Sequence, residues 1–383
     1  MSATLVVLHS VQPLTSQLVT EKFESIRILT DDVSAGVTAT DQPPSVEVVV
    51  APRESWLSKL REWTASGPVE VATNDEYCLT YCARLRDDLG LESRHPLQLD
   101  HYLDKVSMKR ALESAGLLVP LWADLDVVPA AGASLPSDLS FPVVAKPRQE
   151  ANSRGVRVIR DQDGWNQWLA DREGQTGWQV EAHIEAPMYF IDAAVIDGRY
   201  VPLILGQYFG PLLPQPGNPV LGAIEVARDE PLWSRACAFG EQVAHALGSD
   251  GRFVTHLEFF ETQEGLMVME AAARAPGALV SEMGRVAVGI DLETLHLDLQ
   301  SGGPIPRLMR RSEHSAWISL LATPQQVLHD PPAGESQVKI FRRQPRAGTT
   351  GRYVAALALL THDNLDVLRR DSQAWRGHRW LDE

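Results

Sequence analysis

The first hundred residues alternate short β-branched runs with helical segments, and this alternation constrains the fold more than any other feature. Four runs rich in Val, Ile and Leu, bounded by turn residues, are typical of strands: residues 4–11, 25–31, 46–51 and 69–72. Between them, residues 15–23 and 55–63 carry apolar side chains at helical spacing. Because apolar strands joined by helical crossovers form parallel sheets covered on both faces, we expect a small doubly wound α/β domain here.

The segment after the fourth run predicts a helix start. Thr73-Asn74-Asp75-Glu76 has the form of a capping box and predicts a helix running to about Leu89. No G-x-G-x-x-G follows the first strand and no G-x-x-x-x-G-K-[ST] occurs, so neither phosphate-binding fingerprint is present. Cys78 and Cys82 lie one helical turn apart without a further pair at zinc spacing, which predicts buried small hydrophobes.

The net charge, hydropathy and cysteine content exclude several classes of protein. The 383 residues carry a formal net charge of −15, which argues against nucleic-acid or membrane-surface binding because such partners reward clustered positive charge. No apolar run approaches the roughly 18–20 residues of a membrane-spanning helix, and the start at Met1 lacks a basic region typical of secretion signals. Three cysteines do not build a disulfide framework. We therefore expect a cytoplasmic enzyme.

The rest of the chain predicts further elements around two loops. Strands are predicted at residues 141–146, 156–159, 178–184, 189–196, 199–206, 316–322, 336–342 and 353–360. Helices are predicted from Asp104 to Gly116 and at residues 231–248, 278–286, 292–299 and 365–372. Segments 125–139 and 211–219 are rich in Pro and Gly and predict loops.

A predicted hairpin brings two carboxylates together. With Gln263-Glu264-Gly265 as a three-residue turn, Glu258 lies directly opposite Glu270, with Cβ atoms ~5 Å apart on one sheet face. Adjacent carboxylates repel each other, so a divalent cation between them, Mg²⁺ given the oxygen ligands, is the favoured interpretation. The alternative is a shifted register in which one Glu is solvated.

Two cationic features accompany this pair. Arg274 follows Glu270 by four residues and suits the clamping of a carboxylate or phosphoryl group, unless it forms a plain salt bridge to Glu258 or Glu270. Lys146 ends a predicted strand, and the polar loop after it holds a glycine. Such a loop can turn backbone N–H groups onto phosphate oxygens, although alone it is a weak signal.

In chain order, these features resemble the ATP-grasp ligases, the superfamily of D-alanine–D-alanine ligase, biotin carboxylase and dipeptide-forming L-amino acid ligases. The chain most resembles the L-amino acid ligase and carnosine-synthase type, over about residues 70–303. The segments that carry the resemblance are Asp104-Lys105, residues 141–147 (FPVVAKP), 151–156 (ANSRGV), 180–185 (VEAHIE), 255–259 (THLEF) and 270–274 (EAAAR).

The resemblance implies an α/β chain of the ATP-grasp fold, in which two α+β subdomains clasp ATP. The implied units are an N-terminal doubly wound α/β domain (1–103), a small subdomain with a phosphate lid (104–185), a large subdomain with the metal site (186–303) and a small C-terminal α/β appendage (304–383).

The resemblance also implies the nucleotide contacts. Lys105 and Lys146 match the lysines that hold ATP phosphates. The lid over the β- and γ-phosphates is matched by Asn152, Ser153, Arg154, Gly155 and Val156. The hinge that reads the adenine edge, largely through backbone groups, is matched by Glu181, Ala182 and Ile184.

For the metal and the chemistry, Glu258 and Glu270 match Mg²⁺ ligands, with two ions expected and Mn²⁺ as a substitute. Arg274 matches the arginine that stabilises the acyl phosphate and the tetrahedral intermediate. Two positions depart from the family pattern. Met188 stands where an acid usually holds the ribose, which leaves Asp192 as a candidate, and Ala272 stands where an Asn often completes the second metal site.

The implied activity is ATP-dependent amide bond formation between a small-molecule carboxylate and an amine, both expected to be amino acids or similar. The catalytic candidates are Arg274, Lys146, Glu225 and His256, with Glu225 or His256 accepting the proton of the amine and His256 otherwise structural. A homodimer is expected. The alternatives are a thioester-forming ligase that loads an acyl carrier protein through basic residues at 307–311 and 342–343, and a non-catalytic nucleotide-binding module.

Overall fold

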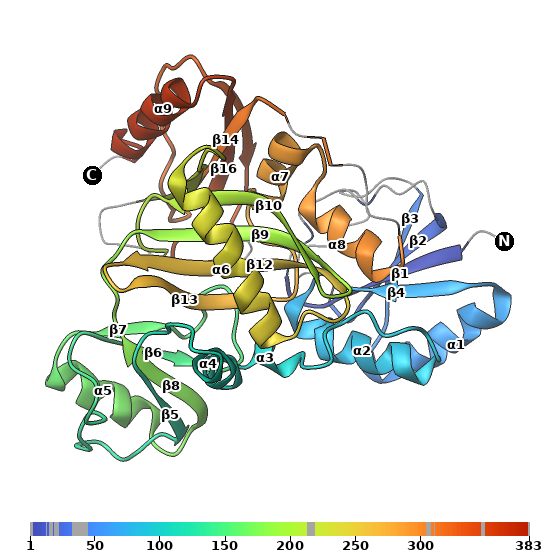
Figure 1. The fold of residues 1–383 in the computed structure, drawn as a ribbon, viewed down its shortest axis with the longest axis horizontal. Coiled ribbons are helices and arrows are strands. Elements are labelled where there is room, and N and C mark those ends of the chain that lie inside the picture. The colour runs from blue at the N-terminus through green and yellow to red at the C-terminus, as the bar shows by residue number, and fades with distance from the viewer. Residues whose placement is uncertain are drawn as a thin grey trace.

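The chain folds around three sheets. The computed structural model describes residues 3–12, 14, 18, 23–32, 45–212, 219–303, 308–309, 311–345 and 349–381. Figure 1 shows the largest sheet at the centre, a small sheet at lower left and the N-terminal sheet at right. Within the described ranges, no helix is both long enough and apolar enough to cross a membrane.

The N-terminal sheet is parallel, as predicted. Its order is β3-β2-β1-β4, with β1 Ala3–His9, β2 Phe23–Thr30, β3 Val46–Val50 and β4 Val69–Ala72. One face packs against α1 (Trp56–Ser66) and α2 (Leu79–Asp88). The opposite face packs against Leu297 of α8 (Leu292–Gln300), a helix from much later in the chain. The helix predicted at 15–23 lies almost entirely outside the described residues.

The segment that leads into α2 starts differently from the predicted capping box. Asp75, not Thr73, is the N-cap, and its side chain accepts from the Tyr77 N–H of a short 3₁₀ helix, η3 (Glu76–Cys78). The Thr73 hydroxyl instead donates to the Leu8 carbonyl at the end of β1. Cys78 and Cys82 are fully buried, as predicted, and burial raises the pKa of Cys82 to about 12.

The small antiparallel sheet forms one wall of the site. Its order is β5-β8-β6-β7, with β5 Trp122–Val127, β8 Thr176–Ala182, β6 Val143–Pro147 and β7 Arg157–Ile159. The predicted loop is wrong over residues 125–127, which belong to β5. Helix α5 (Gln162–Arg172) was not predicted, although Trp165, Trp168 and Leu169 recur at helical spacing and pack beneath this sheet.

The central sheet has eight antiparallel strands, in the order β13-β12-β9-β10-β11-β14-β16-β15. These strands are β9 Met188–Ile196, β10 Arg199–Tyr208, β11 Val220–Glu225, β12 Arg252–Thr262, β13 Gly265–Ala272, β14 His314–Ala322, β15 Gln337–Arg342 and β16 Tyr353–His362. Helix α6 (Pro231–Leu247) covers one face, and α7 (Val280–Val288) with α8 covers the other (Figure 1). Strand β11 was not predicted.

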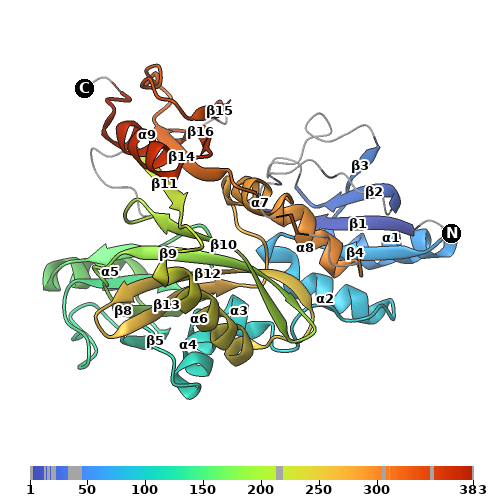
Figure 2. The same cartoon turned by 45° about the horizontal axis from the view of Figure 1, so that its top comes forward.

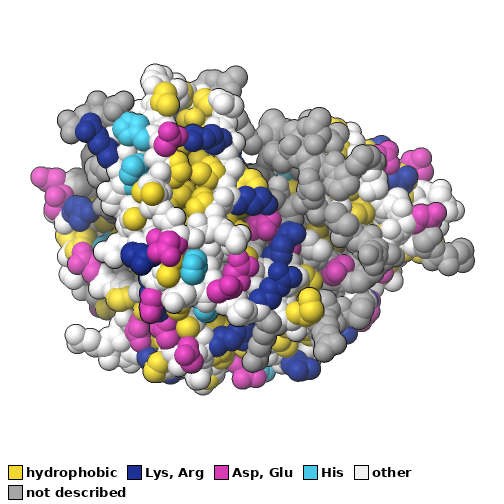
Figure 3. Space-filling model, turned by 90° about the horizontal axis from the view of Figure 1, so that it is seen from above, with side chains coloured by type: hydrophobic (Ala, Val, Ile, Leu, Met, Phe, Trp, Pro, Cys, Tyr) yellow, Lys and Arg dark blue, Asp and Glu magenta, His cyan; other side chains and the backbone are white. Residues whose placement is uncertain are grey.

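The C-terminal segment is built onto this sheet. Strands β14, β16 and β15 extend it beyond β11, and α9 (Leu365–Gly377) packs on them through Leu368 and Trp375. Figure 2 shows this part and the N-terminal sheet as two lobes on the same side of the central strands. On the face seen in Figure 3, basic and acidic side chains are interspersed rather than gathered into a continuous basic surface.

Candidate functional site

The β12–β13 hairpin pairs Glu258 with Glu270, as predicted, but by a different route. Thr262 pairs with Gly265, so the turn holds two residues rather than three. Such a turn in a regular ladder would set Glu258 opposite Met269. A register shift between Glu258 and Phe259 adds one residue on β13, and this bulge restores the carboxylate pair.

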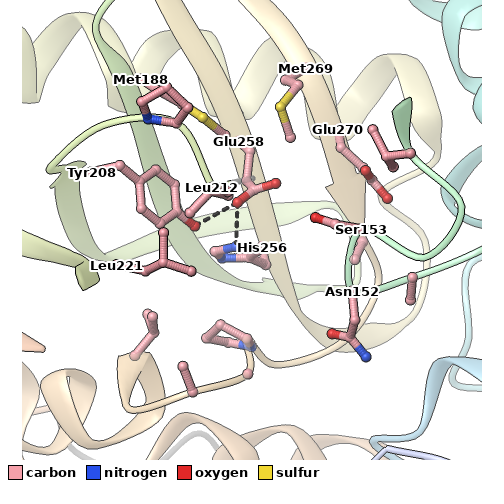
Figure 4. A pocket seen from close by; sticks show the side chains of 18 of the residues that line it. Asn152, Ser153, Met188, Tyr208, Leu212, Leu221, His256, Glu258, Met269 and Glu270 are labelled. Atoms are coloured by element: carbon pink, nitrogen blue, oxygen red, sulfur yellow. Dashed lines mark hydrogen bonds and ion pairs between the residues drawn. The ribbon is translucent and has the colours of Figure 1, made fainter. Parts of the chain in front are cut away.

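One cavity of about 1270 Å³ collects most of the predicted site residues. It is lined by Lys105, Lys146, Asn152, Ser153, Arg154, Val156, Glu181, Ala182, Ile184, His256, Glu258, Glu270 and Arg274. Figure 4 shows the Glu258 and Glu270 carboxylates projecting into it from neighbouring strands. Residues from the small sheet, the central sheet and the N-terminal domain therefore converge on one space.

Lys105 opens helix α4 (Lys105–Ser114), whose N-cap is Asp104, as predicted. The Asp104 carboxylate accepts from the Val106 and Ser107 N–H groups and fixes the first turn. From there the Lys105 ammonium lies 3.0 Å from Glu270 Oε1 and donates to the Glu150 carbonyl at 2.7 Å. Burial disfavours the charged ammonium, but Glu270 together with Glu76 and Glu181 outweighs it and raises the pKa of Lys105, so a cation lies beside the carboxylate pair.

Lys146 belongs to a buried ion-pair triad. Its Nζ lies 2.6 Å from Glu181 Oε1, and Nζ of Lys109 lies 2.8 Å from Glu181 Oε2. All three side chains are at most 6 % exposed. Burial opposes ionisation of Glu181, but the two lysines outweigh it and lower its pKa to about 2. The Glu181 side chain therefore positions Lys146. Lys109 was missed, although it follows Lys105 by one helical turn on the same face of α4.

Arg274 is held by a carboxylate from the N-terminal domain. Its Nε donates to Glu76 Oε2 at 2.7 Å, not to either member of the carboxylate pair. Asn74 accepts from the Ala275 N–H at 2.8 Å, so the loop after β4 fixes the backbone beside Arg274. Glu76 and Asn74 were not assigned to the site from sequence. Both follow the parallel strand β4 at its carboxyl end, where α/β sheets place binding groups.

The polar loop after β6 has backbone geometry suited to anions. Asn152 and Ser153 have φ of 56° and 55°, in the left-handed region that few non-glycine residues adopt. Gly155 has φ of 72°, and a Cβ there would lie 2.9 Å from the Pro147 side chain. Successive N–H groups in turns can form anion-binding concavities, and in this loop the turns are closed by the Arg154 N–H on the Ala151 carbonyl at 3.2 Å and the Val156 N–H on the Ser153 carbonyl at 3.3 Å. Gly155 itself does not line the cavity, so it shapes the loop.

His256 lies between two carboxylates. Its Nδ1 is 2.7 Å from Asp192 Oδ1, and its Nε2 is 3.6 Å from Glu258 Oε1. Burial disfavours the imidazolium, but Asp192 and Glu258 together outweigh it and raise the pKa of His256 to about 10. A protonated imidazole does not accept a proton, which does not fit the predicted role as the base for the amine. The Tyr208 hydroxyl also donates to Glu258 Oε1 at 2.5 Å (Figure 4).

Besides Gly155, two predicted residues lie outside the cavity lining. Asp192 is fully buried beneath His256, so it does not reach a ribose in the cavity, and this prediction is wrong. Glu225 accepts from the Ser315 N–H and lies 3.6 Å from His314, away from the carboxylate pair. Its predicted role as proton acceptor is therefore not supported. Met188 and Ala272, the departures from the family pattern, both line the cavity.

The carboxylate pair fits a magnesium ion that is shared with phosphate. Among the described residues, no group of three or more His, Cys, Asp and Glu could hold a metal ion. Mg²⁺ is commonly bound by one or two carboxylates together with substrate phosphates, and it retains water. Glu258 and Glu270 provide such a pair. Lys105 helps to lower the pKa of Glu270 against its burial, so this carboxylate is ionised at neutral pH.

In the described part of the segment after β1, the backbone N–H groups are bound by a carboxylate of the protein. The backbone N–H groups of Ser10, Val11 and Gln12 donate to one oxygen of Asp75 at 2.6 to 3.2 Å. A carboxylate of the protein thus occupies the concavity where dinucleotide-binding folds place a phosphate.

Comparison with known sequences gives limited information. No family model matches the chain. An uncharacterized protein, y4rH, from Sinorhizobium fredii is 24% identical over 250 residues, which are 61% of this chain and 49% of that protein. The chain thus spans about half the length of this curated relative.

Solved structures give a closer likeness. An L-amino acid ligase from Bacillus licheniformis matches with a TM-score of 0.71 at 16% identity, over 97% of this chain and 96% of that one. An N5-carboxyaminoimidazole ribonucleotide synthetase from Thermus thermophilus matches with a TM-score of 0.65 at 20% identity, over 91% of both chains. The biotin carboxylase domain of a Hydrogenobacter thermophilus 2-oxoglutarate carboxylase was solved with MgADP and bicarbonate. It matches with a TM-score of 0.61 at 14% identity, over 94% of this chain and 86% of that one. All three are ATP-grasp ligases. The chain therefore has the ATP-grasp fold.

Proposed function

We propose that this chain is an ATP-dependent carboxylate–amine ligase that forms an amide bond between amino acids or similar acids and releases ADP and phosphate. The observation that carries the proposal is the cross-strand pair of Glu258 and Glu270, with Lys105, Lys146 and Arg274 lining the same cavity. Such a concentration of charge suits the transfer of a phosphoryl group between anions, which demands positioning and charge neutralisation more than covalent catalysis.

In the proposed reaction, a carboxylate oxygen of the acid attacks the γ-phosphorus of ATP and the bond to the β-phosphate oxygen breaks, which yields an acyl phosphate and ADP. A neutral amine then attacks the acyl carbon, the bond from that carbon to the phosphate oxygen breaks, and the proton lost by the amine nitrogen leaves on the departing phosphate. Lys105 and Lys146 offset the negative charge on the phosphates, and Arg274 stabilises the oxyanion of the tetrahedral intermediate. Glu258 and Glu270 would hold Mg²⁺, which would neutralise the charge that develops on the transferred phosphoryl group.

Water has to be kept from the acyl phosphate. The loop that carries Asn152 and Ser153 lies over the Lys105 side of the cavity, where the Tyr77 hydroxyl donates to Glu150 at 2.7 Å. This contact ties the loop to the N-terminal domain. We propose that the loop covers the triphosphate, and that the unit boundaries expected from sequence, 1–103, 104–185, 186–303 and 304–383, delimit the working parts.

The test is ADP release in the presence of ATP, Mg²⁺ and pairs of amino acids, with mass spectrometry of the products. The proposal is supported if ADP release requires two amino acids and the product has the mass of the two amino acids together minus one water. Release that requires an acyl carrier protein instead would favour thioester formation. ATP binding without ADP release under any of these conditions would identify a non-catalytic nucleotide-binding module.

A further inference from the structure

The cavity extends beyond the charged groups onto an apolar part of the central sheet. Tyr208 on β10, Leu221 on β11, Trp317 and Ser319 on β14 and Leu357 on β16 line the same cavity as Glu258. Figure 4 shows Tyr208, Leu212 and Leu221 on the opposite side of Glu258 from Asn152 and Ser153. The phosphate-binding groups and this apolar region thus lie at different ends of one space.

The strand register fixes this region as a continuous floor. Leu221 pairs with Ser319, and Ser319 pairs with Leu357. Because directly opposed residues in antiparallel strands project to the same face, these three side chains form one row across three strands. Ala223 pairs with both Tyr208 and Trp317, which gives a second row beside the first on the same face.

A roof lies over the floor and starts at the catalytic arginine. Pro276, Gly277 and Ala278 follow Arg274 closely in the chain, lead into Val280 at the start of α7, and line the cavity. Val280 packs in the same apolar cluster as Trp317 and Leu357. The floor is therefore covered by apolar and small residues and adjoins the reacting centre, while Arg343, whose N–H donates to the Ala355 carbonyl of β16, is a charged residue that also lines the cavity.

Tyr208 connects this floor to the metal site. Its hydroxyl donates to Glu258 at 2.5 Å, while its ring lies in the row of Ala223 and Trp317. Under the proposed function, a carboxylate that attacks the γ-phosphorus would lie beside Glu258, which would hold the metal ion. The group attached to that carboxylate then lies over the Tyr208 ring and continues toward Leu221.

The cavity is large enough for both a nucleotide and a substrate. Its volume of about 1270 Å³ exceeds the roughly 300–1,000 Å³ of pockets that hold a single drug-sized ligand. The apolar side chains of the floor favour an apolar occupant, because burying a charged or polar group against them without partners is costly.

Resting on the proposed function, we infer that the acid substrate carries a large apolar side chain, aromatic or branched aliphatic, which is seated on the floor formed by Tyr208, Leu221, Trp317 and Leu357.

The acid can be tested apart from the amine by supplying hydroxylamine as the amine. The full chain is incubated with ATP, Mg²⁺, hydroxylamine and one acid at a time, and ADP and hydroxamate are measured. Phenylalanine, tryptophan, leucine and methionine are compared with glycine, alanine, serine and aspartate. We expect kcat/KM to be at least tenfold higher for the first group, the usual range for filling an apolar pocket.

A matched pair of variants tests whether the side chain of the acid substrate lies on the floor. Leu221→Trp fills the floor and should lower the preference for aromatic over small acids at least tenfold. Leu97→Trp makes the same change at a side chain that is 83% exposed and should leave the preference unchanged. Leu221→Ala, which adds no atoms, serves if the larger side chain prevents folding, and it should weaken binding of the large acids.

The outcomes separate the two proposals. Equal or better turnover of the small or charged acids, with ADP and hydroxamate formed, would overturn the apolar acid site and leave the ligase proposal standing. The apolar acid site would also be overturned if Leu221→Trp and Leu221→Ala both fold, as judged by thermal unfolding, and both keep the parent's preference for large apolar acids over small ones. No ADP from any acid, with hydroxylamine or an amino-acid mixture, despite ATP binding, would overturn the proposed function and with it the inference.

Discussion

Replacing Glu181 by Gln should destabilise the protein more than a typical single substitution. Glu181 lies between two buried lysines, with Nζ of Lys146 at 2.6 Å and Nζ of Lys109 at 2.8 Å. The neutral amide keeps the shape of the side chain but leaves two ammonium groups without their counter-charge. Removing one partner of a buried ion pair costs about 3–5 kcal/mol, because the remaining charge is not compensated.

The pKa of Glu181 gives a magnitude in the same range. It lies at about 2 against an ordinary value of 4.5. Each tenfold change in proton affinity corresponds to about 1.4 kcal/mol, so the ionised carboxylate contributes roughly 3 kcal/mol to the free energy of unfolding. Since its pKa is lowered on folding, this contribution is complete above pH 4.5 and is lost as the pH falls toward 2.

The assay is urea unfolding at pH 7 of Glu181→Gln, Lys109→Met and the double variant. Lys109→Met should cost less than Glu181→Gln, because Glu181 keeps Lys146 as its partner. The double variant should be more stable than Glu181→Gln alone, since Lys146 lines the cavity and can be hydrated. A Glu181→Gln variant within about 0.5 kcal/mol of the parent, or a double variant no more stable than the single one, would refute the triad as the source of stability.

Three further predictions concern the metal site, the loop and a buried histidine. Glu270→Ala should abolish turnover because it removes a metal ligand, and it should lower the unfolding midpoint because the buried Lys105 ammonium loses the carboxylate 3.0 Å away; normal ATP turnover would show that the metal site is wrong. Tyr77→Phe should weaken ATP binding several-fold by calorimetry, since it removes the hydroxyl that donates to Glu150, and an unchanged affinity would count against that role. His296 accepts from the Val254 N–H through Nδ1, and burial lowers its pKa to about 3. Stability should therefore fall by roughly 2 kcal/mol between pH 6.5 and 5, and His296→Gln should flatten this slope; an identical pH profile would contradict it.

The hairpin illustrates how a correct sequence prediction can rest on an incomplete reason. Alternation along 253–271 correctly placed Glu258 opposite Glu270 on one face. The turn was predicted one residue too long, because nothing local distinguishes a longer turn from a tight turn followed by a bulge. The strand order around the pair could not be predicted from local patterns either, since pairing of β12 with β9 joins residues 56 to 72 positions apart.

The sequence by itself determined the parallel N-terminal sheet, the cap at Asp104 and the carboxylate pair, because each depends on local periodicity or on neighbours within one hairpin. Only the tertiary structure decided which charges meet. Glu76 reaches Arg274 across 198 positions, Asp192 supports His256 rather than a ribose, and Lys109 shares Glu181 with Lys146. Long-range ion pairs of this kind depend on how separate sheets pack, and no periodicity along the chain encodes the distance between two side chains from different sheets.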